Sequence, residues 1–350
     1  MHGSPAPASR SGDLAGTPAV RFTASLISFF NPAYWGLPAD LPYPAWEAAF
    51  AEDPRRYFEA MLDGLREAGI GAVELSPDPG GWRQALDAYG SAQAFRSALA
   101  ERGLVMSSSF ASGKRYLTAV LADPGLQGEV DDAFEDNARF AAEVGAAIIV
   151  MTNVPRSRFG NDAPDETVSA EDFTGPVDRN LHERFAEQLN RLGAITARHG
   201  VRIAVHTEAY SVCTRPEDIS VVMALTDPAL VSLCPDAGHI VLDGGDPVAV
   251  LREHIDRIPI MHWKDCVGPL AGHTLRGTQK ERHATMLRNF RVLGAGTIDW
   301  GSWVDVLAAS RWSGWAVEEI DHAEDPVGDL RAGLRYYETE LAHRYAGATR

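Results

Sequence analysis

The feature that most constrains the fold is the regular alternation of short apolar segments with longer amphipathic ones. Eight segments are rich in β-branched residues and almost continuously apolar, which is typical of strands buried on both faces. Amphipathic segments separate them, as expected for parallel strands that are connected by helices. The eight predicted strands are residues 21–30, 71–76, 104–110, 146–152, 202–208, 230–236, 258–265 and 315–321.

Three of the separating segments illustrate the helical pattern. Residues 55–70, 182–200 and 246–258 repeat apolar side chains at helical spacing, so that each segment has one apolar face. Asp246 directly precedes a proline and is a predicted N-terminal cap, whereas Gly200 is a predicted C-terminal stop.

Eight strand–helix units predict a (β/α)8 TIM barrel, a fold that typically takes about 250 residues and more with insertions. A doubly wound open sheet is the alternative, but no glycine-rich fingerprint follows the first predicted strand. The chain has 350 residues, and no shift in composition marks a second domain. We therefore expect a single catalytic barrel domain over residues 21–345.

Three segments fall outside this repeating pattern. Residues 1–20 are rich in Pro, Ser, Ala and Gly and lack the apolar core of a signal peptide, so we expect a flexible N-terminal tail. The predicted connections 153–180 and 266–296 are longer than most loops. Connections of this length are usually lids or binding loops.

The composition restricts the partners that the chain can have. The net charge of −16 opposes binding to a phosphate backbone or to an anionic membrane surface. No apolar run approaches the roughly 20 residues that a bilayer-spanning helix needs. We therefore expect neither a nucleic-acid nor a membrane partner, while a small anionic substrate and homo-oligomerisation stay open.

The chain has three cysteines, Cys213, Cys234 and Cys266. An odd and sparse set in a chain of this size argues against a disulfide framework and favours a reducing compartment. We therefore expect a cytoplasmic protein in which the cysteines are small buried residues.

Polar residues gather at the predicted strand ends, where the chemistry of a TIM barrel is located. Unpaired charges so close to a core would be costly, and a divalent cation that binds them removes this cost. Mixed carboxylate and imidazole ligands suit Mn, Co, Zn or Fe better than a pure-oxygen Mg or Ca site. The residues are Glu74, His206, Glu208, Asp236, His239, His262, Lys264, Asp265, Glu318, Glu319 and Asp321.

Two blocks of sequence resemble a known family. Residues 227–265 and 290–321 look like the xylose-isomerase-like superfamily of TIM barrels, the sugar phosphate isomerase/epimerase family. The stretch "RPEDISVVMALTDPALVSLCPDAGH" is similar to its inosose (2-keto-myo-inositol) dehydratase branch. The resemblance covers residues 180–322 well and the first half of the chain loosely.

The resemblance implies a metal held by residues from four consecutive strands. It matches Asp236 to the family's D-x-G-H motif, His262 to H-x-K-D and Glu319 to the E-x-D motif of the last strand. The fifth strand departs from the pattern, because it reads H-T-E where relatives read Glu-x-His or His-x-His. We expect Glu208 as the fourth ligand, with His206 behind it or facing the substrate, and the reverse assignment stays open.

The resemblance also implies a metal-dependent enzyme that acts on a keto-sugar or keto-polyol. We expect Mn, with Co, Zn, Fe or Mg as alternatives, to polarise the ketone while Glu208 or Glu319 removes a carbon-bound proton to give an enediolate. Return of the proton gives epimerisation or isomerisation. Loss of a β-hydroxyl, with His206 or His239 as the acid, gives dehydration.

Among these reactions we expect an isomerase or epimerase, because these activities are the most frequent in the superfamily. The alternatives are an inosose dehydratase-type lyase and a relative that cleaves carbon-linked glycosides. DNA repair like that of endonuclease IV is disfavoured by the negative charge and by missing histidine ligands. A non-catalytic sugar-binding barrel is a further alternative.

Four residues are predicted to contact the substrate: His239, Lys264, Glu74 and Trp35. Each has a structural alternative. His239 would instead bond to the carboxylate three residues earlier, Lys264 would pair with the following aspartate, and Glu74 would satisfy a neighbouring strand. Trp35 would serve as a core or loop anchor, as single tryptophans commonly do.

Two of the predicted ligands have alternatives as well. Asp236 could be a helix cap rather than a ligand. Glu318 competes with Glu319, because both faces of a barrel strand are buried and the alternation of side chains does not distinguish them.

Overall fold

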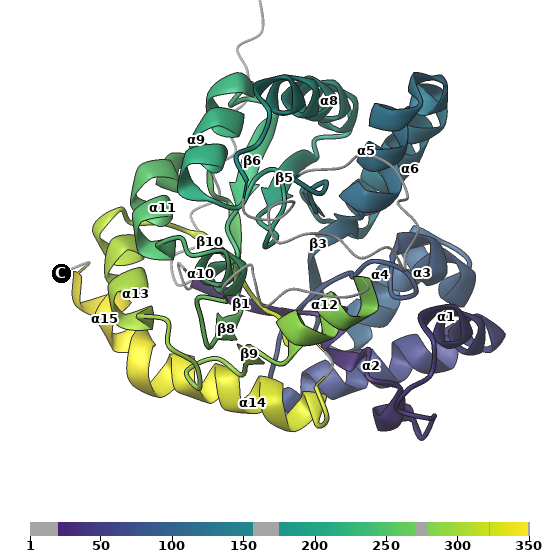
Figure 1. Cartoon of the computed structure of the whole chain (residues 1–350). Helices are drawn as coiled ribbons and strands as arrows, with labels where there is room; N and C mark the ends of the chain where they lie inside the picture. The colour runs from purple at the N-terminus through teal and green to yellow at the C-terminus, as the bar shows by residue number, and fades with distance from the viewer. Residues whose placement is uncertain (1–19, 157–174, 271–278, 322, 349–350) are drawn as a thin grey trace, which may run out of the picture.

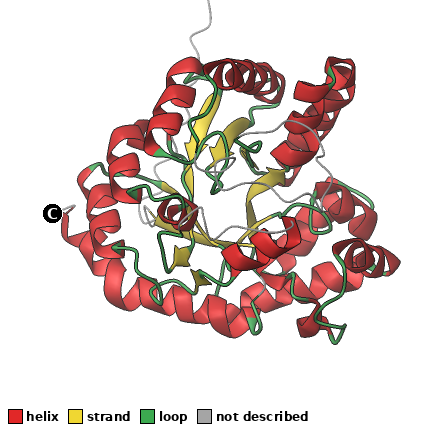
Figure 2. Ribbon diagram, in the orientation of Figure 1, coloured by secondary structure: helices red, strands yellow, loops and turns green. Residues whose placement is uncertain are grey.

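The computed structural model describes residues 20–156, 175–270, 279–321 and 323–348. In this part of the chain, eight parallel strands form one sheet, in the order β6-β5-β4-β3-β2-β1-β10-β7. The strands lie inside a ring of helices (Figures 1 and 2). The predicted single-domain (β/α)8 TIM barrel is thus confirmed.

Each predicted strand segment overlaps one strand of the barrel, and β1, β3 and β10 extend one residue beyond their predicted segments at one end. The strands are β1 (Val20–Ser25), β2 (Ala72–Glu74), β3 (Val105–Ala111), β4 (Ile148–Met151), β5 (Arg202–His206), β6 (Val231–Cys234), β7 (Ile260–Trp263) and β10 (Gly314–Glu318). Two further short strands, β8 (Asp265–Cys266) and β9 (Phe290–Arg291), pair antiparallel within the long connection after β7.

The described helices follow the strands in the expected alternation. They are α1 (Tyr43–Glu52), α2 (Pro54–Ala68), α3 (Trp82–Tyr89), α4 (Ala92–Glu101), α5 (Gly113–Ala122), α6 (Gln127–Val144), α8 (Arg179–Ala197), α9 (Pro216–Leu225), α10 (Ala237–Leu242), α11 (Pro247–His254), α12 (Gln279–Leu287), α13 (Trp300–Ala309), α14 (Pro326–Tyr336) and α15 (Ala342–Ala348).

Local sequence signals fix several of these helix ends. The carboxylate of Asp246 accepts hydrogen bonds from the amides of Val248 and Ala249, and so caps α11 as predicted. Gly200 has a φ of 71° just beyond α8, the left-handed conformation that glycine adopts most easily. The start of α8 lies three residues before the predicted segment, because Asp178 caps it.

The apolar side chains of the strands fill two layers, which explains why the strands are nearly continuous in apolarity. One set packs against the surrounding helices. The other fills the interior of the barrel and consists of Phe110, Ile148, Val150, Ala204, Cys234, Ile260 and Val317.

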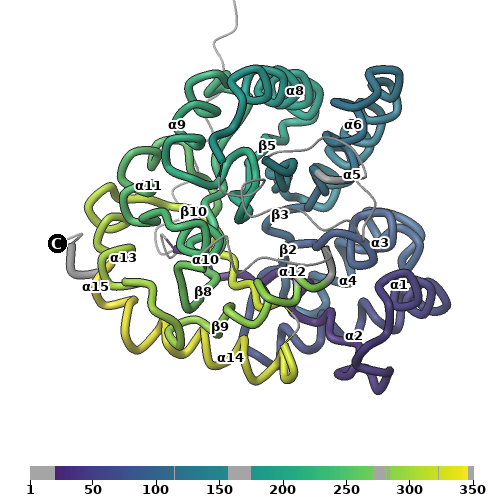
Figure 3. The backbone as a smooth tube through the Cα atoms, viewed as in Figure 1, coloured from purple at the N-terminus to yellow at the C-terminus, as the bar shows by residue number. Residues whose placement is uncertain are grey.

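The barrel closes at two junctions between strands, and the extent of backbone pairing differs between them. β1 pairs in parallel with β10 from Val20↔Gly314 to Ala24↔Glu318, so the first and last strands are fully joined. Figure 3 shows the matching outer contact, where α14 of the C-terminal end runs beside α2. The seam between β6 and β7 is joined by the bridge between Asp236 and His262, with the His262 amide donating to the Pro235 carbonyl at 3.0 Å.

Several predictions concern segments that the structure describes only in part. The predicted tail lies outside the described residues except for Val20, which begins β1. Of the two long connections, residues 157–174 and 271–278 lie outside the described residues.

All three cysteines are buried and none forms a disulfide. Among the described helices, none combines the length and apolarity that crossing a membrane requires.

The last barrel strand and α14 approach each other closely at one point. Glu318 of β10 is fully buried and its carboxylate reaches the backbone of Gly333 in α14. A Cβ atom at position 333 would lie 1.7 Å from Oε1 of Glu318. A side chain at this turn of α14 would therefore force the buried carboxylate of Glu318 to move.

We expect Gly333→Ala to destabilise the protein by about 1–3 kcal/mol, because the methyl group overpacks the contact with Glu318. The matched control is Gly128→Ala in α6, where an added Cβ meets nothing within 4 Å. That change should be neutral or stabilise by up to about 1 kcal/mol, since alanine is the better helix former. Urea unfolding measures both, and equal midpoints for the two variants would contradict the close contact.

Candidate metal centre

Four ionisable side chains converge at the mouth of the barrel. They come from the ends of β5, β6, β7 and β10, and they are His206, Asp236, His262 and Glu319. Each offers one nitrogen or oxygen atom, and these four atoms all lie within 4.8 Å of one another. The carboxyl ends of parallel strands meet at one rim of a barrel, which is why residues far apart in sequence gather here.

Direct contacts connect the four side chains. Nε2 of His206 lies 3.3 Å from Oδ2 of Asp236. Nδ1 of His262 contacts Oε2 of Glu319 and lies 3.9 Å from Oδ2 of Asp236. The two imidazole rings have centroids 4.5 Å apart. The group therefore offers two imidazoles and two carboxylates to one point.

The charge states of the two carboxylates fit a bound cation. Burial opposes ionisation of Asp236, but His239, Lys264 and His206 hold its pKa at about 2. Burial also opposes ionisation of Glu319, and Lys264 and His262 hold its pKa well below the usual value. Both groups are therefore anionic.

The charged groups around His262 also favour a cation at this site. Burial disfavours a charged His262, yet the surrounding carboxylates, Glu74 first among them, raise its pKa well above the usual value. The site thus favours positive charge at this position. Nδ1 of His206 is buried and has no hydrogen-bond partner among the described residues. Two imidazole nitrogens and two anionic oxygens form a donor set that suits Zn, Mn, Co or Fe.

Glu208, the ligand expected from the fifth strand, lies outside this group. β5 ends at His206, so the alternation of side chains does not extend to Glu208, which is half-buried in the following loop. The hydroxyl of Thr207 accepts from the amide of Asp236 at 2.8 Å and donates to its carbonyl at 3.3 Å. These two hydrogen bonds hold Thr207 against the chain that follows β6, and Glu208 comes directly after Thr207 in the loop.

A buried network of ion pairs holds the loop that carries Glu208. The guanidinium of Arg156 lies 3.1 Å from a carboxylate oxygen of Asp218 and 3.0 Å from one of Asp243. The same oxygen of Asp243 accepts from the amide of Tyr210, a residue with a φ of 63°. The loop after β5 is thereby fixed in an unusual conformation beside the barrel mouth.

Asp236 caps a helix and also belongs to the four-residue group. Its Oδ1 accepts from the amide of His239 at 2.9 Å and caps α10. Its Oδ2 faces the imidazole of His206. One carboxylate thus fixes the start of a helix while it presents its other oxygen to the candidate metal site.

Lys264 adds a buried positive charge to the rim. Its Nζ lies 2.8 Å from Oε1 of Glu319 and 2.7 Å from Oδ2 of Asp321. Burial lowers its pKa, but Asp321 and Glu319 outweigh this and raise the pKa above the usual value for lysine. Asp265, the structural partner considered for Lys264, instead accepts from the indole of Trp300 at 2.9 Å and from loop amides.

His239 is held in a neutral form beside Lys264. The amide of Ala209 donates to its Nδ1 at 3.1 Å, so the ring proton belongs on Nε2, which lies 3.3 Å from Nζ of Lys264. Burial and the charge of Lys264 lower the pKa of His239 to about 4. The ring of Phe290, a residue that the sequence analysis missed, packs against His239 and lies 4.5 Å below the ammonium group of Lys264.

The two other predicted substrate contacts lie in different surroundings. Glu74 is fully buried beneath His262, with its carboxylate bonded to Ser108. Trp35 is half-buried, and its indole donates to the Phe29 carbonyl at 2.8 Å. Its ring packs against Tyr57 with the centroids 4.8 Å apart. Neither residue belongs to the four-residue group.

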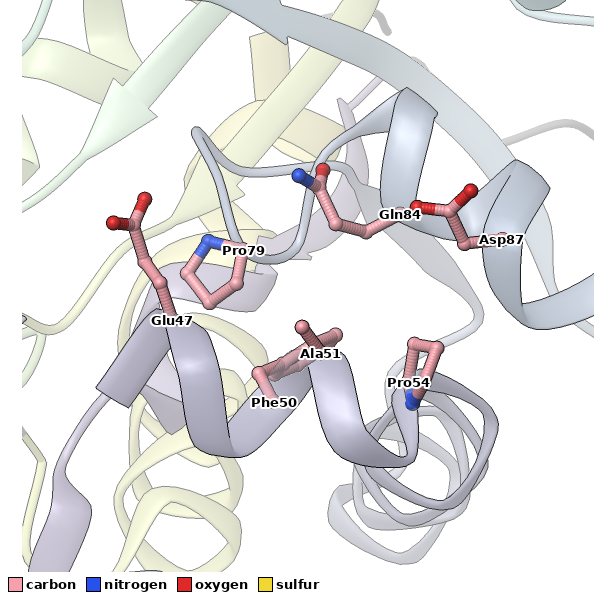
Figure 4. Close-up of a pocket in the computed structure, with 7 residues that line it drawn as sticks. All are labelled: Glu47, Phe50, Ala51, Pro54, Pro79, Gln84 and Asp87. Carbon is pink, nitrogen blue, oxygen red and sulfur yellow. The ribbon is translucent and has the colours of Figure 1, made fainter. Parts of the chain in front are cut away.

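A surface cavity of about 280 Å³ lies apart from this chemistry. Residues of α1, α3 and the loop after β2 surround it, together with the first residue of α2 (Figure 4). None of the predicted site residues lines it. The lining residues are Glu47, Phe50, Ala51, Pro54, Pro79, Gln84 and Asp87.

The family profile described as xylose isomerase-like TIM barrel matches residues 62–340. The chain therefore belongs to this family, as its strand-end motifs indicated. The relatives similar to this chain include two that are named inosose dehydratase and match it over about two thirds of its length. The one from Geobacillus thermodenitrificans is 31% identical over 233 residues, 66% of this chain and 74% of the relative. The one from Lactiplantibacillus plantarum is 28% identical over 239 residues, 67% of this chain and 74% of the relative.

Solved structures share the fold at low sequence identity. A probable 3-DHS dehydratase of petrobactin synthesis from Bacillus anthracis has a TM-score of 0.62 at 12% identity, over 91% of this chain and 99% of that one. The IOLI protein with a bound zinc atom has a TM-score of 0.62 at 12% identity, over 93% and 99%. An L-ribulose 3-epimerase has a TM-score of 0.59 at 14% identity, over 84% and 92%.

Glu318, the alternative to Glu319, provides a test of the electrostatics. Its carboxylate faces α14 instead of the four-residue group, and burial raises its pKa well above the usual value. Ionisation of Glu318 is therefore disfavoured in the folded protein. In the unfolded chain, the same carboxyl group has a pKa of about 4.3. Its contribution to stability is complete below that pH and is lost as pH rises toward the folded pKa.

We expect Glu318→Gln to become more stable than the unmodified protein as pH rises from about 5 to about 8. The difference should grow by up to about 1.4 kcal/mol for each pH unit over which Glu318 stays protonated when folded. Urea unfolding of both proteins across this range isolates the residue. A constant difference would show that Glu318 ionises normally.

Proposed function

We propose that the chain is a metal-dependent enzyme that dehydrates a keto-polyol, in the manner named for its inosose dehydratase relatives. The observation that carries the proposal is the convergence of four buried ligand groups at one rim, with Lys264 and His239 beside them. The relatives at 28–31% identity support the choice of dehydration over the isomerisation or epimerisation favoured by the sequence alone.

The ligands in this proposal are His206, Asp236, His262 and Glu319, with His206 in the place expected for Glu208. Their two nitrogens and two anionic oxygens suit a divalent ion such as Zn or Mn. When bound, such an ion polarises a ketone and so acidifies the neighbouring carbon-bound proton. The remaining groups at the rim then have separate tasks.

Glu208 is the carboxylate that we assign as general base. It is half-buried in the loop beside the rim and contributes to the electrostatic field at His239. It takes the proton from the carbon next to the ketone, and the electron pair of that bond forms the enolate. Lys264, a permanent cation, stabilises negative charge on substrate oxygen.

The elimination is then completed at the neighbouring carbon. The enolate electrons form a carbon–carbon double bond as the β-hydroxyl departs. The proton held by Glu208 passes to that hydroxyl, which leaves as water, so the step needs no further reactant. The neutral His239 presents its Nε2 proton as a hydrogen-bond donor for the departing oxygen.

The second candidate reaction is epimerisation or isomerisation. The fold that the chain shares with an L-ribulose 3-epimerase supports this alternative. Both reactions begin with the same proton removal. They differ in whether the proton returns to carbon or leaves with the hydroxyl.

The purified protein, loaded in turn with Mn, Zn or Co, should convert inosose to a diketone with the loss of one water, seen by mass spectrometry and by the product chromophore. An epimerase would keep the substrate mass and would incorporate solvent deuterium next to the ketone. A chelator should abolish turnover and re-addition of metal should restore it. Full turnover after chelation would refute a metal-dependent reaction.

The choice between His206 and Glu208 as ligand has its own test. We expect His206→Ala to weaken Zn and Co binding by roughly 100-fold or more, since it removes a ligand whereas lost supporting contacts typically cost 10–100-fold. Glu208→Gln should bind metal normally but lower kcat by about 10²–10⁴-fold, the usual worth of a general base. Competition with a chromophoric chelator measures affinity, and the opposite pattern would identify Glu208 as the ligand.

A further inference from the structure

A fully buried carboxylate supports the candidate metal centre from behind. Glu74, the last residue of β2, has no exposed surface, and neither has His262. Oε1 of Glu74 lies 3.1 Å from Nε2 of His262, and Oε2 lies 3.3 Å from the same nitrogen. The imidazole therefore has Glu74 on one edge and the other ligand groups on the opposite edge.

Both ring nitrogens of His262 face carboxylates: Nε2 faces Glu74, and Nδ1 faces Glu319 and Asp236. A carboxylate only accepts hydrogen bonds, so Nε2 keeps a proton directed at Glu74. A metal held by the four-residue group would replace the proton on Nδ1, because Nδ1 is the nitrogen that faces the other ligand groups. A carboxylate behind a histidine also makes the distal nitrogen a stronger donor to a metal.

Glu74 is itself fixed by a chain of buried hydroxyl groups. Ser108 of β3 donates to Oε2 of Glu74 at 2.8 Å, and its hydroxyl lies 3.3 Å from that of Ser107. Ser107 donates to the Val73 carbonyl at 3.0 Å and lies 3.1 Å from the hydroxyl of Thr23 on β1. All of these side chains are buried.

A break in strand register creates this chain. β2 and β3 pair as Val73↔Met106 and then Glu74↔Ser108, so one residue of β3 is skipped. The skipped residue is Ser107. The irregularity brings the hydroxyl of Ser108 next to the Glu74 carboxylate and leaves Ser107 to bridge the strands. Such irregularities commonly re-aim side chains beside active sites.

We infer that Glu74 is a positioning residue of the metal centre: it fixes the tautomer and orientation of His262, and Ser108 holds it in place. The inference rests on the proposed function, in which His262 is a ligand. It assigns Glu74 a role different from the substrate contact expected from the sequence. A buried carboxylate with a purely structural role would affect stability and leave the affinity for metal unchanged.

Glu74→Gln keeps the shape of the side chain and removes its charge. We expect it to weaken Zn and Co binding by about 10–100-fold, the usual effect of losing such a partner. Competition with a chromophoric chelator gives the affinity, and the visible absorption of the Co-loaded protein should change because the field at Nδ1 of His262 changes. Neither readout depends on turnover.

The matched control is Glu318→Gln, which alters an equally buried glutamate on β10 that faces α14. This variant should bind Zn and Co with the affinity and Co spectrum of the unmodified protein. Ser108→Ala keeps the Glu74 charge and should weaken binding in the same direction as Glu74→Gln but by a smaller factor. It also provides the measurement if Glu74→Gln does not fold.

The outcomes separate this inference from the proposed function. Unchanged affinity and spectrum in Glu74→Gln, or in Ser108→Ala where that variant stands in, would overturn the positioning role alone. A parallel loss of affinity in Glu318→Gln would also overturn it, because the effect would then follow from the substitution of any buried glutamate near the rim. If the unmodified protein binds neither Zn nor Co, both the inference and the proposed function fail.

Discussion

The structure depends on how the barrel closes between β6 and β7. Along this seam the strands come together at the backbone bridge of Asp236 and His262, just at the rim. The same two residues supply side chains to the four-residue group. The contact that joins these two strands therefore also positions two members of the candidate site, and an ion held there would link the strands through side chains where backbone pairing is sparse.

The second organising feature is an imbalance of charge. Around the rim, the carboxylates of Asp236, Glu319 and Asp321 lie within 3.8 Å of the ammonium group of Lys264, and the carboxylate of Glu74 faces His262. Burial makes such an excess of negative charge costly, and a bound divalent ion reduces that cost. The same carboxylates raise the pKa of Lys264 and keep it charged, so the rim carries a cation that can face substrate oxygen.

Much of this architecture could be predicted from the sequence. The strands were recognisable because burial on both faces makes them continuously apolar, and Asp236 was recognisable because it interrupts such a run. The fifth strand was harder, since the choice between His206 and Glu208 depends on the residue at which β5 ends. The role of Glu74 was hidden for a different reason: its partner Ser108 is adjacent only through a skipped residue in the pairing of two strands, which local patterns do not record.

The two oxygens of Asp236 have a consequence for how such sites are lost during divergence. One oxygen caps α10 and the other faces the candidate metal site. Asparagine caps helices about as well as aspartate but lacks the negative charge that attracts a cation. A single exchange at this position would thus preserve the helix cap while it removes one anionic oxygen from the candidate metal site. One atom of one side chain thus separates a charged member of the four-residue group from a neutral helix cap.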